Sequence, residues 1–527
     1  MIEIMGKRNV LVICILFLIV LTVSRVLWTH TFGNQKTVHI AGGQLDLRGW
    51  DAESGEVLSL DGEWEFYPGR WLMEDEGPGA EEASAQLVQV PGRWNAALNP
   101  GEPTPYGYGS YRLRVYVDPE DKRNYSLRVS SVRSASEVYV NGRLLAGSGV
   151  TGKSREEYTA RNLPYTTSFA ADENGVIDIV VQAANFKDSR GGGIARSIKF
   201  GSEKTVTKTV NWSSYMQLLS AVFFLIHALY AFVLYWLGTR KRQLLYVALF
   251  AVSLSLSFLL SNDEKLFHHF FYIDYDWDFR VTNALLVVAG AAVIGCTDHQ
   301  QLPIWRKIYP YYFAAAFGTA AVTLMLPTEG VLSLFPVYFV LLILAVVVVL
   351  IATFQKIIKN VVGQMPILLS FIAIVNHFAW TIIWREQGIS VIHYPFDIIT
   401  AMVLFASILF KDYFKTHAET KELAASLQRI NENKDQFLAN TSHEFRNPLH
   451  IMLNMSQAVL ERERHALSGR SVKELETILS VGRRMSLLLD DLIDVNSLRV
   501  GTPRLVKRAV RIQPIVTGVM DMLEVAL

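Results

Sequence analysis

Seven long apolar runs fill the middle of this 527-residue chain and restrict its fold more than any other feature. A run of about 20 apolar residues can cross a bilayer as a helix, and a helix satisfies its own backbone hydrogen bonds there. The sequence therefore predicts a seven-helix transmembrane domain over residues 213–410. Its runs lie at 213–237, 243–261, 281–297, 309–326, 331–353, 364–384 and 393–410.

The loops between these runs predict the side of the membrane that each end faces. Lys and Arg stay mostly on the cytoplasmic side of a membrane protein. They recur in the first, third and fifth loops and after the last run, whereas the second loop is acidic and the fourth has no Lys or Arg. The sixth has only Arg385, beside Glu386. We expect a multi-pass protein of the bacterial cell membrane, with residues after 411 in the cytoplasm.

Few polar side chains lie inside the runs, and His227, Asn376 and His377 stand out among them. Ionisable groups within a membrane are functional candidates by default. A lone histidine is more often a contact between two helices, so both interpretations stay open for these residues.

The N-terminal residues 1–30 predict a signal anchor or a signal peptide. Lys7 and Arg8 precede an apolar run from residue 10 to residue 23, which residues 26–28 extend past Arg25. No convincing small-x-small cleavage site follows Leu21, which favours an uncleaved anchor. In both cases the segment that follows is exported.

Residues 36–205 show the alternation of apolar and polar residues that is typical of half-buried strands. Leu113, Val115 and Val117 alternate with polar neighbours, and Asn141-Gly142 between two such runs predicts a tight hairpin. The region therefore predicts an all-β sandwich outside the cytoplasm. The overall fold class is multidomain: this sandwich, a polytopic α-helical membrane domain and a cytoplasmic helical hairpin.

This β region resembles the jelly-roll, sugar-binding-like domains at the front of some glycosidases and receptors. The segments that carry the resemblance are LDGEWEFY (60–67), VPGRW (90–94), YRL (111–113) and VYVNG (138–142). The resemblance implies a possible small-molecule or carbohydrate ligand, and Trp64 and Trp94 are candidates to stack on it. The alternative is that both tryptophans pack in the core, because a sandwich fold does not fix a ligand.

Composition excludes several other classes of function. A net charge of +1 gives no reason to expect a nucleic-acid partner. The only cysteines are Cys14 and Cys296, so a disulfide framework and a cysteine-built zinc site are both excluded, and we expect no metal site.

After the last membrane run, two regions with helical periodicity follow. Residues 411–432 predict a coiled-coil helix, because Leu423, Leu427 and Ile430 lie on one seam, with Phe437 further along. Residues 433–500 predict a helical hairpin, with a turn near Gly469 and an apolar stripe on the second helix over 472–498. Two such hairpins would bury their stripes in a dimeric four-helix bundle.

The first helix of the hairpin contains FLANTSHEFRNPL at 437–449. This segment resembles the phosphoacceptor box of sensor histidine kinases, Ser-His-Glu-x-Arg-(Thr/Asn)-Pro-Leu. The resemblance implies that His443 is phosphorylated, that Glu444 acts as the general base, and that Asn447 positions water when the partner is dephosphorylated. Attack by a neutral imidazole nitrogen requires a nearby group that takes the ring proton, which explains the adjacent carboxylate.

The resemblance also implies ATP and Mg²⁺ as cofactors, a homodimer, and transfer of the phosphate to an aspartate in a response-regulator receiver domain. Histidine kinases hold ATP in a separate domain, of which residues 501–527 look like only the start. The chain is therefore interpreted as a fragment of a two-component sensor kinase. The alternatives are a truncated non-catalytic receptor or phosphotransfer scaffold, and an exported carbohydrate-processing enzyme. The whole layout resembles seven-transmembrane receptors with diverse intracellular signalling modules.

Overall fold

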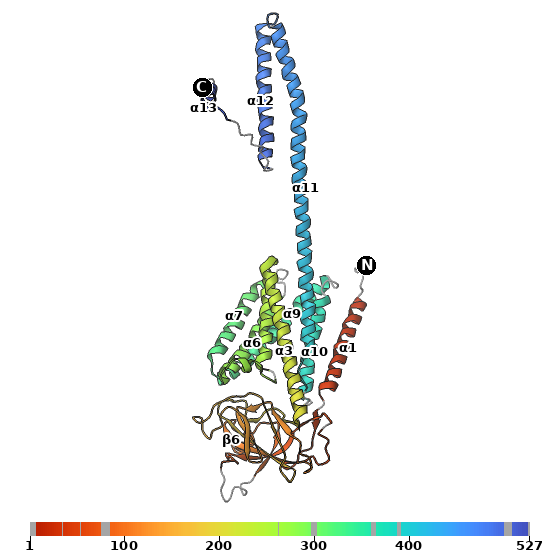
Figure 1. The fold of residues 1–527 in the computed structure, drawn as a ribbon, viewed down its shortest axis with the longest axis vertical. Coiled ribbons are helices and arrows are strands. Elements are labelled where there is room, and N and C mark those ends of the chain that lie inside the picture. Colours follow the sequence, from red (N-terminus) through yellow and green to blue (C-terminus); the bar gives the residue numbers. More distant parts are fainter. Residues whose placement is uncertain are drawn as a thin grey trace. The chain divides into compact units, whose positions relative to one another are not determined.

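The computed structural model describes residues 7–33, 35–52, 54–74, 85–261, 263–296, 303–359, 365–386, 391–499 and 509–524. Its contacts divide the chain into two compact units, Met1–Phe410 and Lys411–Leu527. The first unit contains a β domain and a set of apolar helices, and the second unit is helical (Figure 1).

Two sheets build the β domain. One has the strand order β1-β3-β14-β7-β11, and the other has the order β10-β9-β12-β6-β4-β5, with β2 paired to β6. The first sheet uses β1 (Gln35–Thr37), β3 (Val57–Ser59), β14 (Lys199–Ser202), β7 (Tyr125–Val129) and β11 (Tyr165–Phe169). The second uses β10 (Arg143–Ser148), β9 (Ala135–Val140), β12 (Val176–Asn185), β6 (Gly107–Tyr116), β4 (Gly62–Pro68), β5 (Gln86–Val90) and β2 (Gln44–Asp46). A small pair is formed by β8 (Val132–Arg133) and β13 (Gly193–Ile194), and the short helix α2 (Asn95–Leu98) follows β5.

Both sheets contribute to a single hydrophobic core. Leu127 and Phe200 come from the first sheet, and Leu113 and Ile179 come from the second; all four are fully buried. The predicted alternation along β6 is confirmed, since Leu113 and Val115 are buried between half-buried neighbours. A β-sheet N-terminal domain with a core shared between two sheets is therefore present.

The predicted hairpin at Asn141-Gly142 is confirmed. Strands β9 and β10 pair antiparallel, with Val140 opposite Arg143. Asn141 and Gly142 have φ values of 50° and 78°, the left-handed region that a two-residue hairpin turn requires. Glycine is favoured there because it has no Cβ, and asparagine because its short polar side chain can hydrogen-bond to nearby backbone, which is why this dipeptide predicts the turn from sequence.

In the described part of the chain, long helices lie in each of the seven predicted apolar runs and in the N-terminal segment. They are α1 (Lys7–Phe32), α3 (Glu203–Leu234) with a π-helical turn at Tyr235–Thr239, α4 (Arg242–Ser261), α6 (Tyr275–Gly295), α7 (Pro303–Met325), α9 (Phe335–Lys359), α10 (Met365–Glu386) and α11 (Phe396–Glu463), with the short helices α5 (Phe267–Phe270) and α8 (Thr328–Ser333) in loops. Within the described residues, six helices are long and apolar enough to cross a membrane: α1, α3, α4, α6, α7 and α10. A shorter apolar stretch covers Phe335–Val349. The seventh predicted run forms the start of α11, so the predicted count of seven spans stays a prediction.

Charged side chains join the β domain to the loops between these helices. Arg128 of β7 pairs with Glu264, both nearly fully buried, and Arg196 pairs with Asp263. The Tyr275 hydroxyl donates to Asp188 Oδ2 at 2.8 Å. The acidic second loop of the helical region is thus in contact with the β domain.

The second unit contains the predicted hairpin. After α11 the chain turns at residues 464–468, and α12 (Gly469–Arg499) begins with Ser468 Oγ accepting from the Ser471 amide at 3.2 Å. The predicted turn and second helix are therefore confirmed. Of the predicted start of an ATP-binding domain, residues 501–508 and 525–527 lie outside the described residues, and α13 (Ile512–Glu524) is a helix.

Candidate functional site

His443 lies on α11 in the second unit, and its side chain is exposed to solvent. Glu444 and Asn447 are exposed on the same helix. Asn447 follows His443 by four residues, so it lies about 6 Å further along the axis and on nearly the same face. The structure therefore brings His443 and Asn447 together on one accessible face of α11.

Glu444 projects from a different face of α11 than His443 does. Successive residues on a helix project about 100° apart, so Glu444 does not face His443 as Asn447 does. Within the described part of the chain no hydrogen bond joins the two side chains. A proton transfer from His443 to Glu444 therefore requires the long, exposed glutamate side chain to turn toward the ring.

Pro448 lies inside α11 without ending it. The amide that proline lacks is the one that would bond to the carbonyl of Glu444, four residues earlier. One backbone acceptor directly after His443 is thus left without its helical partner.

An ion pair links α11 to α12. Arg446 Nη2 contacts Asp490 Oδ1 at 2.5 Å. Arg446 follows His443 by three residues, so the two lie on adjacent parts of the surface of α11. The exposed histidine therefore lies beside the contact with α12. Sequence reasoning missed Asp490, because no local pattern connects residues 44 positions apart.

Gly482 of α12 packs against Leu453 of α11. A Cβ atom placed there would lie 2.6 Å from Leu453 Cδ2, so a larger residue would force the end of the Leu453 side chain to move. A glycine inside an otherwise good helical pattern was the sequence signal that could have found it.

An open apolar groove runs between α11 and α12. It is lined by Leu449, Met452, Leu453, Thr477, Ile478, Val481, Gly482 and Met485. Ile478 and Met485 are each 52% exposed, although they belong to the stripe that predicted a buried face. The side chains of Leu492 and Val495, which continue that stripe, lie outside the described residues.

His450 is the other histidine on this part of α11. It is also exposed, and Ile451 rather than a carboxylate follows it. Solvent exposure therefore does not distinguish His443 from His450 as the candidate phosphoacceptor. The residue that follows each histidine does distinguish them.

Trp64 and Trp94 are placed in the core of the β domain. Both are fully buried; the Trp64 indole donates to the Leu60 carbonyl at 3.0 Å and the Trp94 indole to the Pro105 carbonyl at 3.1 Å. The rings of Trp94 and Tyr111 are stacked 6.4 Å apart. The ligand-stacking hypothesis for these tryptophans is therefore corrected, because core side chains already cover their faces.

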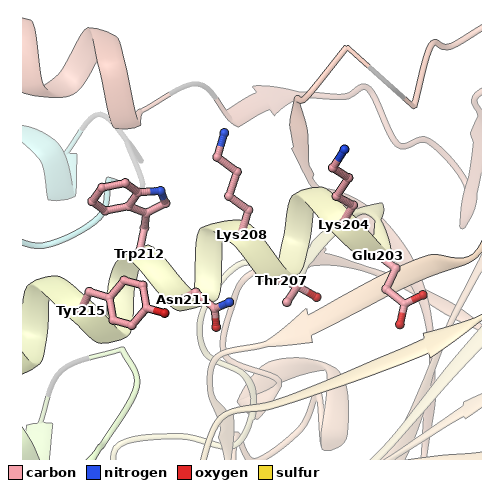
Figure 2. Close-up of a pocket in the computed structure, with 7 residues that line it drawn as sticks. All are labelled: Glu203, Lys204, Thr207, Lys208, Asn211, Trp212 and Tyr215. Carbon is pink, nitrogen blue, oxygen red and sulfur yellow. The ribbon is translucent and has the colours of Figure 1, made fainter.

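A groove in the first unit runs along the start of α3 (Figure 2). Lys204 and Lys208 lie four residues apart on one side of the helix, with Trp212 and Tyr215 one and two turns further on. Lysines next to aromatic rings are typical of a membrane boundary. His443 is not among the residues that line this groove.

Comparison with known proteins identifies the hairpin. Residues 433–501 match the His Kinase A (phospho-acceptor) domain. The chain is also similar to the hybrid signal transduction histidine kinase D of Dictyostelium discoideum, with 30% identity over 83 residues, or 16% of this chain and 5% of that protein. It is 29% identical over 108 residues to the circadian input-output histidine kinase CikA of Synechococcus elongatus, or 20% of this chain and 14% of that protein. These matches support a sensor histidine kinase, although the chain spans only a small part of each relative.

Solved structures similar to this chain include a GH2 β-galacturonidase from Eisenbergiella tayi and a β-glucuronidase from Ruminococcus gnavus. The first has a TM-score of 0.20 and 19% identity, covering 28% of this chain and 24% of the enzyme. The second has a TM-score of 0.21 and 18% identity, covering 28% of each chain. TM-scores this low carry no argument about function, so the β domain is described by its own strands and core alone.

Proposed function

We propose that this chain is the sensing and membrane part of a two-component sensor histidine kinase, with His443 as its phosphoacceptor. The observation that carries the proposal is the match of residues 433–501 to a phosphoacceptor domain in which His443 is exposed on a two-helix hairpin. In this proposal the β domain is an extracytoplasmic, jelly-roll-like sensor. Seven membrane helices connect it to the cytoplasmic hairpin.

The proposed reaction uses three residues of this chain. ATP with Mg²⁺, held by an ATP-binding domain, supplies the phosphoryl group. A ring nitrogen of His443 forms the new N–P bond as the P–O bond to ADP breaks, and the other ring nitrogen loses its proton to Glu444. Asn447 is on the face of His443 and positions water for the reverse, dephosphorylating activity on the receiver domain of a response regulator.

Dimerisation follows from the apolar groove of the hairpin. Ile478, Val481 and Met485 are exposed in one chain and would be covered by a second hairpin, giving a four-helix bundle. Leu423, Leu427 and Ile430 on α11 are also more than half exposed and would continue the contact as a coiled coil.

Phosphate labelling tests the proposal. The full chain in membrane vesicles is mixed with a separately purified histidine-kinase ATP-binding domain and γ-labelled ATP. We expect an acid-labile label that His443→Gln abolishes and the matched control His450→Gln retains. Glu444→Gln should slow labelling by about 10²–10⁴-fold, the usual contribution of a general base. Asn447→Ala should spare labelling and weaken dephosphorylation of the receiver domain.

Two results would contradict this function. Label that survives His443→Gln would place the acceptor elsewhere. No label on the parent chain, with an ATP-binding domain that labels its own hairpin, would favour a non-catalytic receptor or scaffold.

A further inference from the structure

Arg25 of α1 is fully buried within the first unit. It lies seven residues before the end of a helix that is otherwise apolar from Val10 to Val23. A charged side chain among apolar helices is costly unless every donor finds a partner. Its surroundings therefore indicate what α1 is bound to.

Helix α10, the first turn of α11 and the residues just before α11 supply those partners. Arg25 Nε donates to Asp397 Oδ2 at 2.7 Å, and Nη1 donates to the Tyr394 carbonyl at 3.2 Å. Nη2 lies 2.5 Å from Asp397 Oδ2 and 3.0 Å from His377 Nδ1. The Asn376 amide donates to the other oxygen of Asp397 at 3.4 Å. All three guanidinium nitrogens are thus engaged.

Two aromatic rings complete the enclosure. The guanidinium carbon lies 4.0 Å from the ring centre of Phe396 and 5.0 Å from that of Trp384. A delocalised guanidinium stacks on such rings and pairs with a carboxylate at the same time, which a lysine ammonium does less well. Asp397, His377, Asn376, Trp384 and Phe396 together form what we call the guanidinium cage.

Further contacts hold α1 along the same face. The Trp28 indole donates to the Ile392 carbonyl at 2.9 Å, and the Trp384 indole donates to Thr29 Oγ1 at 3.2 Å. One turn before Arg25, Leu21 is buried in a cluster with Ala373 of α10 and Ala401 of α11. These contacts continue on both sides of the cage, so the docking does not rest on one ion pair.

We propose that the guanidinium cage is a binding site for Arg25, and that α1 is retained as a bound helix of the membrane domain rather than removed as a signal peptide. Removal of α1 would leave Asp397 buried without its counter-ion. Asp397 lies in the first turn of α11, the helix whose bounds include His443. Arg25 is thus a positioning residue that sets the start of α11. Any effect of Arg25 on phosphorylation of His443 rests on the proposed kinase function.

A cross-link tests the docking of α1 independently of kinase activity. The full chain in vesicles carries Cys14→Ser and Cys296→Ser, with Leu21→Cys and Ala373→Cys as the reporting pair. Oxidation should form the 21–373 disulfide in the parent, measured by loss of maleimide-reactive thiols and by the linked peptide in mass spectrometry. Arg25→Leu or Asp397→Leu alone should lower its yield several-fold, because each leaves a charge unpaired. The double variant should restore the yield, since a buried ion pair is replaceable by apolar residues.

The controls separate the cage from general damage. Arg242→Leu removes an exposed arginine at the start of α4 and should leave the yield unchanged. An unchanged yield in Arg25→Leu would overturn the proposal, as would a purified chain whose N-terminal sequence begins after Phe32. His443 labelling in the same vesicles should change several-fold in the single variants and recover in the double variant. Absence of label in the parent would refute the kinase function, while the cross-link would still decide the cage.

Discussion

In the β domain Trp64, Trp94 and Phe66 are fully buried, whereas in the hairpin Ile478 and Met485 are about half exposed. Both regions were predicted to bury an apolar face, and only the β domain does so within one chain. Its two sheets cover each other, while two helices leave one side of their apolar stripe open. The difference supports the proposed dimer, in which a second hairpin covers the open side of the stripe.

Polar side chains also differ in burial between the β domain and the hairpin. Asp188 in the β domain is fully buried and has Arg190 Nη2 at 2.7 Å and the Tyr275 hydroxyl at 2.8 Å. The residues proposed for chemistry in the hairpin, such as His443, are exposed. Buried polar groups of this kind stabilise a structure, while exposed ones are accessible to a partner.

The largest expected effect is on the core of the β domain. Trp94→Ala removes a fully buried ring packed against Phe66 and Tyr111, and should destabilise the domain by about 3–5 kcal/mol. Hydrogen exchange of β4 and β6 amides in the full chain measures the loss. Leu87→Ala, at a position that is 54% exposed, is the control and should change little. If Trp94→Ala changes the hydrogen exchange as little as Leu87→Ala does, burial of the Trp94 ring does not stabilise the core.

The next effect tests whether the hairpin needs a partner. Ile478→Asp places a charge in the open groove and should weaken dimerisation of the segment 418–500 by about 100-fold, since burial of one isoleucine contributes about 1.5–3 kcal/mol. Analytical ultracentrifugation measures the dissociation. Arg470→Gln, on the exposed start of α12, should leave it unchanged. If the unmodified segment 418–500 is a folded monomer, the hairpin does not need a second chain, and its proposed difference from the β domain is wrong.

A smaller effect is expected from acid. Burial acts to raise the pKa of Asp188, but the hydrogen bond and charge of Arg190 outweigh it and hold that pKa below its usual value. A carboxyl whose folded pKa is depressed stabilises the fold above its unfolded pKa of about 4, and this contribution is lost as the pH falls through the folded pKa. Thermal unfolding of the β domain should therefore show a loss below about pH 4 that Asp188→Asn reduces. An identical acid response in the variant would show that other carboxyls cause the loss.

The smallest effect concerns the β9–β10 turn. Gly142 has a φ of 78°, and an added Cβ would meet no atom within 4 Å, so Gly142→Ala costs only the backbone strain, about 1–2 kcal/mol. Gly101→Ala is the matched control, because its Cβ would make only an ordinary contact at 3.8 Å. Equal unfolding free energies for the two variants would mean that the turn tolerates the side chain.

Local pattern was enough to predict much of this molecule. The alternation at Leu113 and Val115 predicted β6, and Asn141-Gly142 predicted the β9–β10 hairpin. The apolar stripe after residue 472 predicted α12. The box around His443 predicted a phosphoacceptor domain, which the match over residues 433–501 supports. Each of these patterns depends on neighbours in sequence, through side-chain periodicity or backbone conformation.

Contacts between distant residues could not be predicted in this way. The sequence by itself determined that Trp64 and Trp94 are large and apolar and that Arg25 interrupts an apolar run. Only the tertiary structure decided that both tryptophans lie inside the core, and that Arg25 meets Asp397, 372 positions away. The physical reason is that burial and pairing depend on which elements pack together, and no short-range spacing in the chain encodes that choice.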